Sequence, residues 1–480
     1  MPDYPGTRHT GWNRLLVGQV AVLLLVNVMV DTVITAPVIV LPRMIEHFGT
    51  DQPAWLNSSA MLAGAMWSPL LGKTADRHGK RKVLVLTLVL AAVGALVCMV
   101  APSLWVFILG RVVQGAAVAS LFLTVGIVRD LCAPRIGMIV TGIVTTGNAV
   151  FGIGSAFLFD VLGDVYGYQV VFVVSGVLAV STAILVRFLL PESLVRTPGR
   201  IDVAGALLLG GGLALGAAYL SFGSEYGWFR ALPLVLAGAA ALVGWFLLAR
   251  RVPEPVVDIT DLGRPLVLTL LVVVLGTGAY QSMLQLFSLL TEVSPDQGLG
   301  YGLAGGAAIG LLLGLPSIGI VLGGTLAGAL ATRIGPAATL AAGVALGTVG
   351  TVGLFAAAAT LPLAAVCSFL LSLTAGTLVT SGFNMASILA PPQRQAAVSS
   401  QVMVMIALGS VVLNFVGAAV LKATRVTVGG ATANSATGVF GYVGIGTAAF
   451  LVAGVLAVSL VRTQRGTPAT ERVGSSHGLG

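Results

Sequence analysis

Long apolar segments recur along the whole chain, and they constrain its fold more than any other feature of the sequence. A helix needs about 20 mostly apolar residues to cross a bilayer. Fourteen segments meet this requirement, at residues 15–41, 54–72, 83–101, 104–127, 136–158, 166–186, 203–222, 231–249, 265–290, 302–329, 337–358, 361–388, 396–421 and 438–461. Only 9% of the residues are charged, whereas soluble chains carry about a quarter. The sequence therefore predicts an all-α integral membrane protein with fourteen transmembrane helices.

Basic residues follow a pattern that orients these spans. The chain has 25 Lys and Arg residues. They lie in one set of alternate loops or in the two tails, except for Arg43, Arg111, Arg230, Lys422 and Arg425. Basic loops stay in the cytoplasm, so we predict a multi-pass protein of the bacterial cytoplasmic membrane with both termini inside. The net charge of +8 is then explained by topology, and no nucleic-acid partner is expected.

Two charged residues depart from this pattern, because Asp31 and Arg111 alone fall inside predicted spans. A charge in the hydrocarbon core costs about 2.5–3.5 kcal/mol, and such residues usually face a bundle interior and serve a function. Asp31 lies about ten residues and Arg111 about seven residues from the outer ends of their spans, so their depths differ by only a few ångströms. A hydrogen-bonded pair between them is geometrically possible.

An internal repeat divides the chain. Residues 72–79 read GKTADRHG and residues 328–335 read GALATRIG, so Gly, Ala, Arg and Gly recur at the same offsets. The pattern predicts two six-helix bundles related by a pseudo-two-fold axis, with two helices inserted between them. The expected domains are residues 1–195, 196–263 and 264–462, followed by a disordered cytoplasmic tail at 463–480. Repeated halves place the substrate site near the membrane midplane, between the two bundles.

Several motifs resemble the major facilitator superfamily, and specifically its fourteen-span drug:proton antiporter branch. Residues 72–82 are similar to the signature loop of the superfamily, and residues 30–42, VDTVITAPVIVLP, are similar to the first-helix motif of the branch. The string RVVQG at residues 111–115 matches its Arg-x-x-Gln-Gly motif, whose arginine is linked to proton transfer. Residues 200–205 resemble the start of the two additional helices, and residues 300–303 are glycine-rich like the tenth helix of many members.

The resemblance implies a conformational latch at the cytoplasmic surface. Its members would be Gly72, Asp76, Arg77, Gly79, Arg129 and Asp130. Asp76 would lie near the positive N-terminal end of the helix at 396–421, where a carboxylate is stabilised. The alternative interpretation is a plain basic loop on the cytoplasmic side. Thr332 replaces the acid expected in the second copy of the loop, so the two halves would be electrostatically unequal.

One departure concerns the antiporter motif of the fifth span, which normally holds a Gly-Pro pair followed two residues later by Gly-Gly. Here Asn148 replaces the proline and Phe151 replaces one of the later glycines. A proline would remove a helical hydrogen bond and bend the span, whereas Asn148 keeps its N–H and adds a polar side chain. The resemblance therefore supports the fold more strongly than it supports strict antiport.

The two membrane charges suggest how a proton could be exchanged for cargo. Arg111 would stabilise ionised Asp31, and protonation of Asp31 would release Arg111 and change the favoured conformation. Coupling follows only if proton and substrate prefer different states. Asn27, one helical turn before Asp31, could steady its carboxylate. The alternative is a purely structural ion pair between the first and fourth spans.

Neutral polar residues inside the other spans would line a cavity for an amphipathic substrate, although hydrogen bonding between helices is an equal alternative. The candidates are Asn27, Gln114, Asn148, Tyr280, Gln281, Gln285, Ser381 and Asn384. No metal-ligand spacing, catalytic triad or nucleotide-binding P-loop occurs in the sequence, so we expect no metal, no cofactor and no enzymatic activity.

These observations predict a proton-coupled exporter of drug-like or natural-product molecules that works by alternating access. Its partners would be a small-molecule substrate, protons and the lipid bilayer, and a monomer is expected. The alternative is an exporter of an endogenous lipid or metabolite with the same fold and without strict proton antiport.

Overall fold

A computed structural model describes residues 9–49, 53–193, 202–252, 263–292, 301, 315–357, 360–390, 394–428 and 431–465. Several predictions lie outside these residues: the motif at 200–201, the domain boundary at 195–196, the first half of the span at 302–329 and the tail after residue 465.

The N-terminal bundle is built from helices that follow one another with short connections. They are α1 (Arg14–Ile39), α2 (Leu41–Phe48), α3 (Pro53–His78), α4 (Lys80–Met99), α5 (Leu104–Gln114), the 3-10 segment η1 (Gly115–Ala119), α6 (Ser120–Leu131), α7 (Pro134–Thr146), α8 (Ala149–Tyr166) and α9 (Gln169–Leu189). The fourth predicted span is thus divided into α5, η1 and α6, and the fifth into α7 and α8.

The C-terminal bundle has long, mostly unbroken helices. They are α12 (Arg264–Glu292), α14 (Leu315–Ile334), α15 (Pro336–Ala357), α16 (Leu361–Leu389), α17 (Gln395–Ala423) and α18 (Ala436–Arg465). Between the bundles, α10 (Val203–Tyr226) and α11 (Trp228–Ala249) form the two inserted helices. Eleven helices within the described residues are long and apolar enough to cross a membrane. The molecule is therefore an α-helical multi-pass membrane protein, and fourteen spans remain compatible with it.

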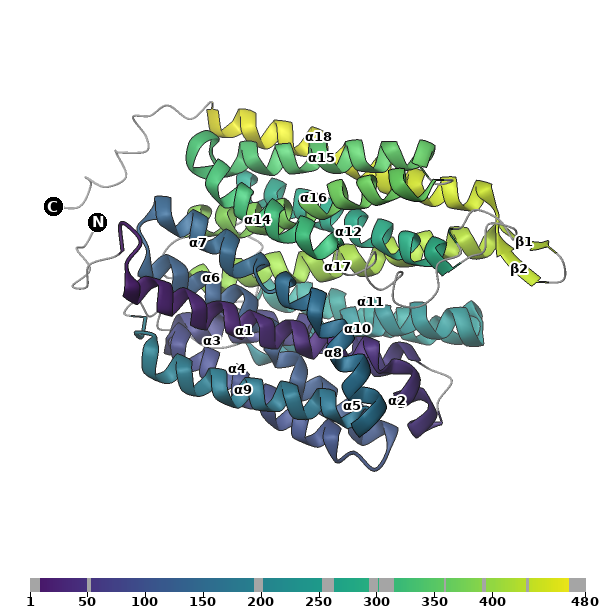
Figure 1. Cartoon of the computed structure of the whole chain (residues 1–480), viewed down its shortest axis with the longest axis horizontal. Helices are drawn as coiled ribbons and strands as arrows, with labels where there is room; N and C mark the ends of the chain where they lie inside the picture. The colour runs from purple at the N-terminus through teal and green to yellow at the C-terminus, as the bar shows by residue number, and fades with distance from the viewer. Residues whose placement is uncertain are drawn as a thin grey trace.

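The two bundles lie side by side (Figure 1). They meet mainly where α3 packs against α17 and where α7 packs against α14. These are corresponding pairs in the two halves, because α3 and α14 are the second and tenth predicted spans that carry the repeat. α1 begins and α18 ends at the same end of the molecule, which we call the inner end.

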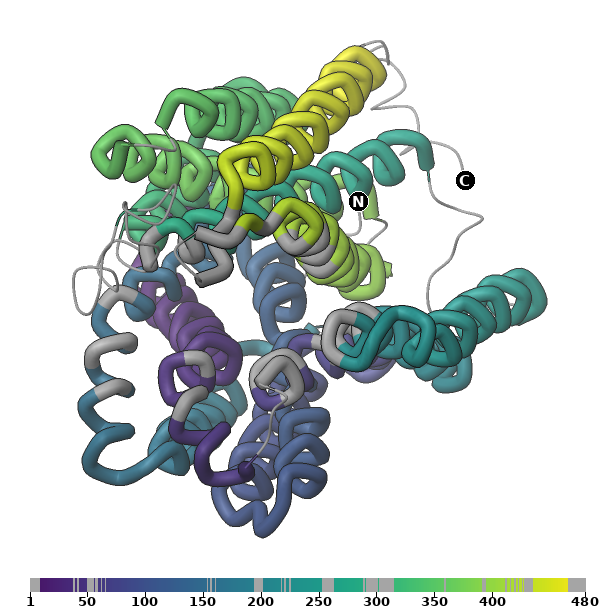
Figure 2. Tube along the Cα trace, turned by 90° about the vertical axis from the view of Figure 1, so that its right-hand side faces the viewer, coloured from purple at the N-terminus to yellow at the C-terminus, as the bar shows by residue number. Residues whose placement is uncertain are grey.

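The inserted helices α10 and α11 pack closely on each other, and α10 also contacts α3. Figure 2 shows this pair extending away from the two bundles. Most of α11 is exposed to the surroundings, which is expected for a helix whose apolar surface faces lipid.

A short β-hairpin in the described residues departs from the all-α prediction. Strands β1 (Arg425–Val428) and β2 (Ala431–Asn434) pair antiparallel between α17 and α18, with Arg425 opposite Asn434. The sequence had predicted only a connecting loop there. Its signal was short: a β-branched alternation, RVTV, followed by two glycines and ATAN, which favours a hairpin.

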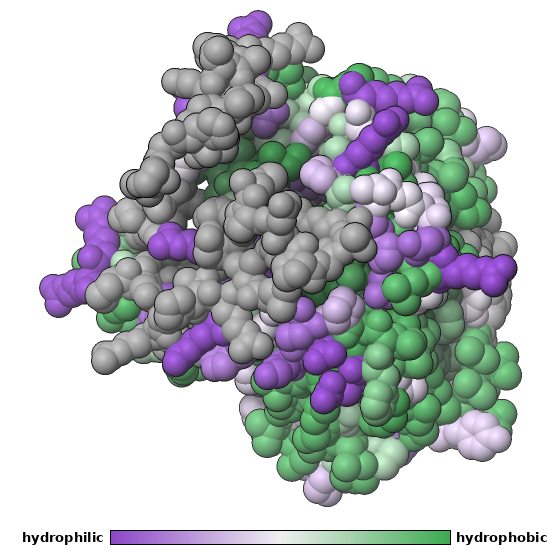
Figure 3. Space-filling model, turned by 90° about the vertical axis from the view of Figure 1, so that its left-hand side faces the viewer, coloured by the Kyte–Doolittle hydropathy of each residue, from purple (hydrophilic) through white to green (hydrophobic). Residues whose placement is uncertain are grey.

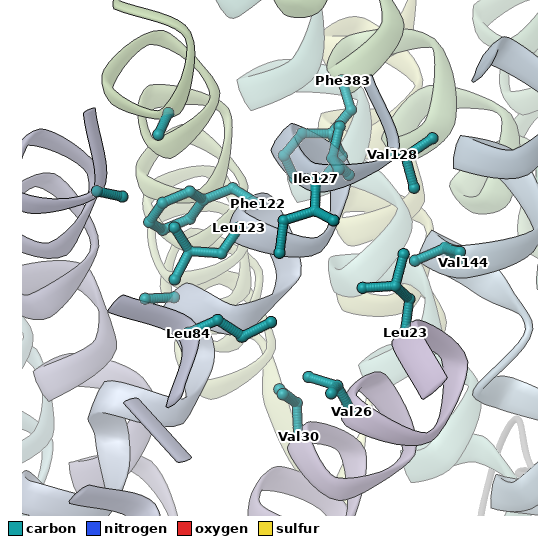
Figure 4. Packing of buried hydrophobic residues seen from close by; sticks show 14 of the residues in the cluster. Leu23, Val26, Val30, Leu84, Phe122, Leu123, Ile127, Val128, Val144 and Phe383 are labelled. Carbon is teal, nitrogen blue, oxygen red and sulfur yellow. The ribbon is translucent and has the colours of Figure 1, made fainter. Parts of the chain in front are cut away.

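The largest hydrophobic core crosses the boundary between the bundles at the inner end. Phe122 and Ile127 of α6 belong to the same buried cluster as Phe383 of α16 and Val402 of α17. Figure 4 shows Phe383 among side chains from the N-terminal bundle. Because the cluster includes residues from both halves, it seals the space between them at this end.

Surface polarity agrees with a membrane-embedded body. Seen from the inner end, hydrophilic side chains gather on the end face, and hydrophobic side chains cover the flank below it (Figure 3). Such a pattern is expected when the flanks contact lipid and the ends contact water.

Candidate substrate and proton site between the bundles

Arg111 is completely buried in the N-terminal bundle, with 0% of its surface exposed. Its Nη1 donates to the carbonyl of Val33 at 2.9 Å and to Oε1 of Gln114 at 2.7 Å. Gln114 in turn donates to Ser175 Oγ at 3.2 Å. The guanidinium also lies 5.9 Å from the ring centre of Phe172. Arg111 therefore joins α5 to α1 and, through Gln114, to α9.

Small residues allow this close arrangement. A Cβ added at Gly115 would collide with the Ala60 carbonyl of α3, and one added at Gly94 would collide with the backbone of Gln114. The chain also tightens from α-helix to 3-10 helix at Gly115. A 3-10 segment inside a longer helix often marks a functional position.

The described neighbours of Asp31 are Thr35 of its own helix and Gly152 of α8. Thr35 Oγ1 donates to Asp31 Oδ1 at 3.2 Å. A Cβ built on Gly152 of α8 would lie 3.9 Å from Asp31 Oδ2 and 3.5 Å from Ser317 Oγ of α14. Asp31 is half-buried and lies beside Gly152, which in turn lies beside α14 of the second bundle.

The direct Asp31–Arg111 pair that the sequence suggested is absent from the interactions described for either residue. Arg111 instead reaches α1 at Val33, two residues beyond Asp31. Residues two apart on a helix point in divergent directions. In this conformation Arg111 therefore contacts α1 through the Val33 carbonyl rather than through the Asp31 carboxylate.

Asn27 also has partners that the sequence did not indicate. Its Nδ2 donates to the Val144 carbonyl of α7 at 2.5 Å and lies 3.4 Å from Thr124 Oγ1 of α6. Asn27 therefore holds α1 against α6 and α7. The hydrogen bond to the Asp31 carboxylate that Asn27 was expected to supply comes from Thr35.

The fifth span is interrupted at the position of the missing proline. α7 ends at Thr146, and Phe151 N donates to the Asn148 carbonyl at 2.9 Å, which is a 3-10-type bond. Asn148 is half-buried and precedes α8 without capping it through its side chain. The interruption therefore exists although this position holds Asn148 and not proline.

The predicted cavity residues of the second bundle occupy different environments. Tyr280 packs inside that bundle beside Met283, Gln281 is half-buried, and Gln285 is exposed. Ser381 and Asn384 of α16 are 0% and 3% exposed. The structure therefore does not bring all the candidates to one surface.

The signature loop brings Asp76 to the start of α17. Its carboxylate accepts hydrogen bonds from the backbone N–H groups of Ala396 and Ala397, at 3.0 and 2.9 Å. These N–H groups belong to the first turn, where a helix lacks internal acceptors and attracts negative charge. A Cβ added at Gly72 would come within 3.0 Å of the Ala396 carbonyl oxygen and the Ser400 side chain, so glycine allows α3 and α17 to approach there.

Lys80 is a further member of this contact that the sequence reasoning did not single out. It is 3% exposed, and its Nζ donates to both carboxylate oxygens of Asp130, at 2.9 and 3.0 Å. It also donates to Gln395 Oε1 at 2.8 Å. Because Gln395 begins α17, Lys80 joins both bundles as Asp76 does. The available signal was the lysine directly after Gly79 in the motif.

A second unpredicted residue, Glu192, braces the same loop from within the N-terminal half. Glu192 Oε1 accepts from the backbone N of Arg81 at 3.1 Å, and Oε2 lies 3.6 Å from Arg81 Nε. Gly79 adopts φ +103, and a Cβ there would lie 2.5 Å from Glu192 Oε1. Of the remaining latch candidates, Arg77 is exposed and Arg129 is half-buried beside Asp130.

Asp76 is expected to make closure of the inner end pH-dependent. Burial raises the pKa of Asp76 to about 6, although the N–H groups of Ala397 and Ala396 and the charge of Lys80 act in the opposite direction. The pKa is raised in the closed form, so this form takes up a proton as the pH falls through about 6. Linkage then predicts that acidification from pH 7.5 to 5 favours closure about tenfold over a form with Asp76 in water.

Distances between spin labels at Lys82→Cys and Arg333→Cys, two exposed inner-end positions in different bundles, would measure this closure. We expect the short-distance population to grow at low pH, and the change to disappear with Asp76→Asn. Growth of the long-distance population at low pH would contradict this expectation.

Close backbone packing also joins α7 to α14. A Cβ added at Gly142 would collide with the Gly324 carbonyl oxygen, and one added at Gly328 would lie 2.6 Å from the Met138 carbonyl oxygen. Thr145 Oγ1 forms a hydrogen bond of 3.1 Å with Thr380 Oγ1 of α16. Small residues thus let the bundles touch directly near the inner end.

Two helical bundles that lie side by side and are joined by a contact at one end form the fold class to which many membrane transporters belong. Residues 22–413 match the Major Facilitator Superfamily. The chain belongs to that family.

Relatives with different cargoes support this assignment. A triacylglyceride transporter of Mycolicibacterium hassiacum is 32% identical over 306 residues, or 59% of this chain and 53% of the relative. The multidrug resistance protein B homolog of Mycobacterium tuberculosis is 28% identical over 372 residues, or 74% of this chain and 65% of the relative. The chain thus covers between 53% and 65% of the length of these relatives.

Solved structures share the fold at low sequence identity. A proton:xylose symporter superimposes with a TM-score of 0.63 at 13% identity, over 95% of this chain and 96% of that one. The human organic anion transporter MFSD10 has a TM-score of 0.59 at 17% identity, over 94% and 98% of the two chains.

Proposed function

We propose that this protein is a proton-coupled exporter of amphipathic, drug-like or natural-product molecules in the bacterial cytoplasmic membrane. The inner end faces the cytoplasm, together with both termini. The observation that carries the proposal is the position of Asp31, an acid inside a predicted span that lies beside Gly152, where α8 approaches Ser317 of the second bundle. An acid at that boundary is reached by cargo and protons only in some conformations, which coupled exchange requires.

Arg111 supports the same mechanism through α1. It holds the Val33 carbonyl, two residues from Asp31, so a change at the acid that shifts α1 also changes the contacts of the arginine. Asp76 and Lys80 act at the inner end as the latch that favours the closed form. Asp31 exchanges the proton, Arg111 relays the change to α5 and α9, and the latch opens for the next cargo molecule.

Accumulation of cargo in inside-out vesicles tests this function. A panel of amphipathic compounds including ethidium and chloramphenicol is added after the vesicle interior has been acidified by respiration. We expect accumulation that stops when an uncoupler collapses the proton gradient, together with alkalinisation of the interior when cargo is added. Accumulation without any proton movement would refute proton coupling.

Export of a lipid or endogenous metabolite is the second candidate. It is supported by the relative named a triacylglyceride transporter and by Asn148 at the position of the antiporter proline. Under this candidate, the vesicles would move a neutral lipid probe and leave the drug panel outside.

A further inference from the structure

Among the buried polar atoms near the inner end that have no hydrogen-bond partner in the described residues are three from α16 and α17. They are Ser381 Oγ and Asn384 Nδ2 of α16 and Gln401 Oε1 of α17. The three side chains are at most 6% exposed. Most buried polar groups in proteins are hydrogen-bonded, so each exception requires an explanation.

Asn384 and Gln401 lie at a similar depth, and Ser381 lies about one helical turn deeper. Asn384 is five residues before the end of α16 at Leu389, and Gln401 is six residues after the start of α17 at Gln395. At 1.5 Å per residue, both lie about 8–9 Å from the inner ends of their helices. The helices touch at this level, because a Cβ added at Gly382 would lie 3.5 Å from Val402 Cγ1.

The same layer lies at the boundary between the bundles. Thr380 contacts Thr145 of α7 across that boundary, and Asn384 is one turn further along the same face of α16. Phe383 and Val402 belong to the core that seals the inner end. Separation of the bundles would therefore uncover this layer and free the Thr380 hydroxyl as well.

We propose that Ser381, Asn384 and Gln401 form a cytoplasmic subsite that binds an uncharged hydrogen-bonding group of the cargo, such as an amide or a hydroxyl, in the inward-facing form. This inference rests on the proposed export function and specifies its substrate class. The three atoms supply a hydroxyl, an amide donor and an amide acceptor, which match a group that both donates and accepts.

The scarcity of charged residues in α16 and α17 disfavours charged cargo groups at this position. α16 has no charged residue, and Lys422 at the far end is the only one in α17. Asp76 and Lys80 lie at the first turn of α17 but are already engaged with the Ala396 and Ala397 N–H groups and with Asp130. A cationic or anionic group would therefore lose its hydration here without a counter-charge from α16 or α17. The surrounding apolar side chains would take the remainder of the molecule, as in other sites for amphipathic ligands.

Binding of radiolabelled chloramphenicol, an uncharged amide with hydroxyl groups, to the purified full-length protein tests the subsite. Losing one hydrogen bond should raise the dissociation constant about tenfold in Asn384→Leu and in Gln401→Leu. Ethidium, a permanent cation, should bind more weakly than chloramphenicol to the wild type. Melting temperatures should stay unchanged or rise, because each substitution removes a buried atom that lacks a partner.

Thr377→Val provides the matched control on the same helix. Thr377 Oγ1 already donates to the Leu373 and Gly323 carbonyls, so its replacement should lower the melting temperature and leave chloramphenicol affinity unchanged. Ser381→Ala, a milder change, keeps the test informative if a leucine variant does not fold.

Two outcomes would overturn the subsite: equal chloramphenicol affinity in the wild type and the three subsite variants, or a wild type that binds ethidium in preference to chloramphenicol. The proposed export function fails separately, when chloramphenicol binds to the wild type as expected but its transport moves no protons.

Discussion

Replacement of Asp31 by asparagine is expected to abolish export driven by a proton gradient, with a loss of about 100-fold or more. Asparagine keeps the shape of the side chain and can still accept from Thr35, which donates to Asp31 Oδ1 at 3.2 Å. It cannot take up or release a proton in the relevant pH range, so the coupled cycle loses its exchange step. Initial rates of gradient-driven accumulation in inside-out vesicles measure the effect.

Two comparisons separate lost coupling from lost folding. Glu46→Gln neutralises an exposed acid of α2 and should leave the rate unchanged. Asp31→Asn should also retain exchange of labelled for unlabelled cargo in the absence of a gradient, since binding and alternating access remain. Wild-type accumulation by Asp31→Asn, with the usual dependence on the gradient, would show that Asp31 carries no coupling.

The second large effect is expected at Gly142, where replacement by valine should hold the inner end open. The Cβ of any side chain would collide with the Gly324 carbonyl oxygen of α14. That obstacle is backbone in a helix and moves only with the helix. Overpacking of this kind costs about 1–3 kcal/mol or more, which changes the ratio of closed to open forms about ten- to hundredfold.

Spin-label distances between Lys82→Cys and Arg333→Cys report this change directly, as a population shifted to long distances, and export should fall in parallel. Gly18→Val is the matched control, because a Cβ at Gly18 of α1 meets no atom within 4 Å. An unchanged distance distribution in Gly142→Val would show that the α7–α14 crossing does not limit closure.

Local sequence was sufficient to predict the helices, because the need to satisfy backbone hydrogen bonds in lipid applies to each segment separately. Each apolar segment must satisfy its own backbone hydrogen bonds in lipid, and a helix does this without help from neighbours. Within the described residues, the predicted segments accordingly fall on a helix or on consecutive helices, whereas residues 302–314 of the tenth segment lie outside those residues. The short hairpin at Arg425–Asn434 was missed because its signal covers only a few residues.

The motifs were less informative about partners. The loop at 72–82 pointed to Asp76, and the backbone N–H groups of Ala396 and Ala397 do receive it. Lys80 was not identified because its partners, Asp130 and Gln395, are distant from it in sequence. Glu192 was not identified because it lies after α9, far in sequence from Arg81, which it contacts. Asn27 was expected at Asp31, yet it binds the Val144 carbonyl of α7, a contact that helical spacing within α1 cannot reveal.

Sequence alone predicted the apolar helical segments, the two charges inside them and the repeated loop motif. These depend on composition and on spacing along single helices. Only the tertiary structure decided that Arg111 holds a backbone carbonyl instead of Asp31, and that the inner end is closed by glycine contacts and a mixed core. Such choices depend on how helices rotate and approach one another, which is a property of their packing surfaces together.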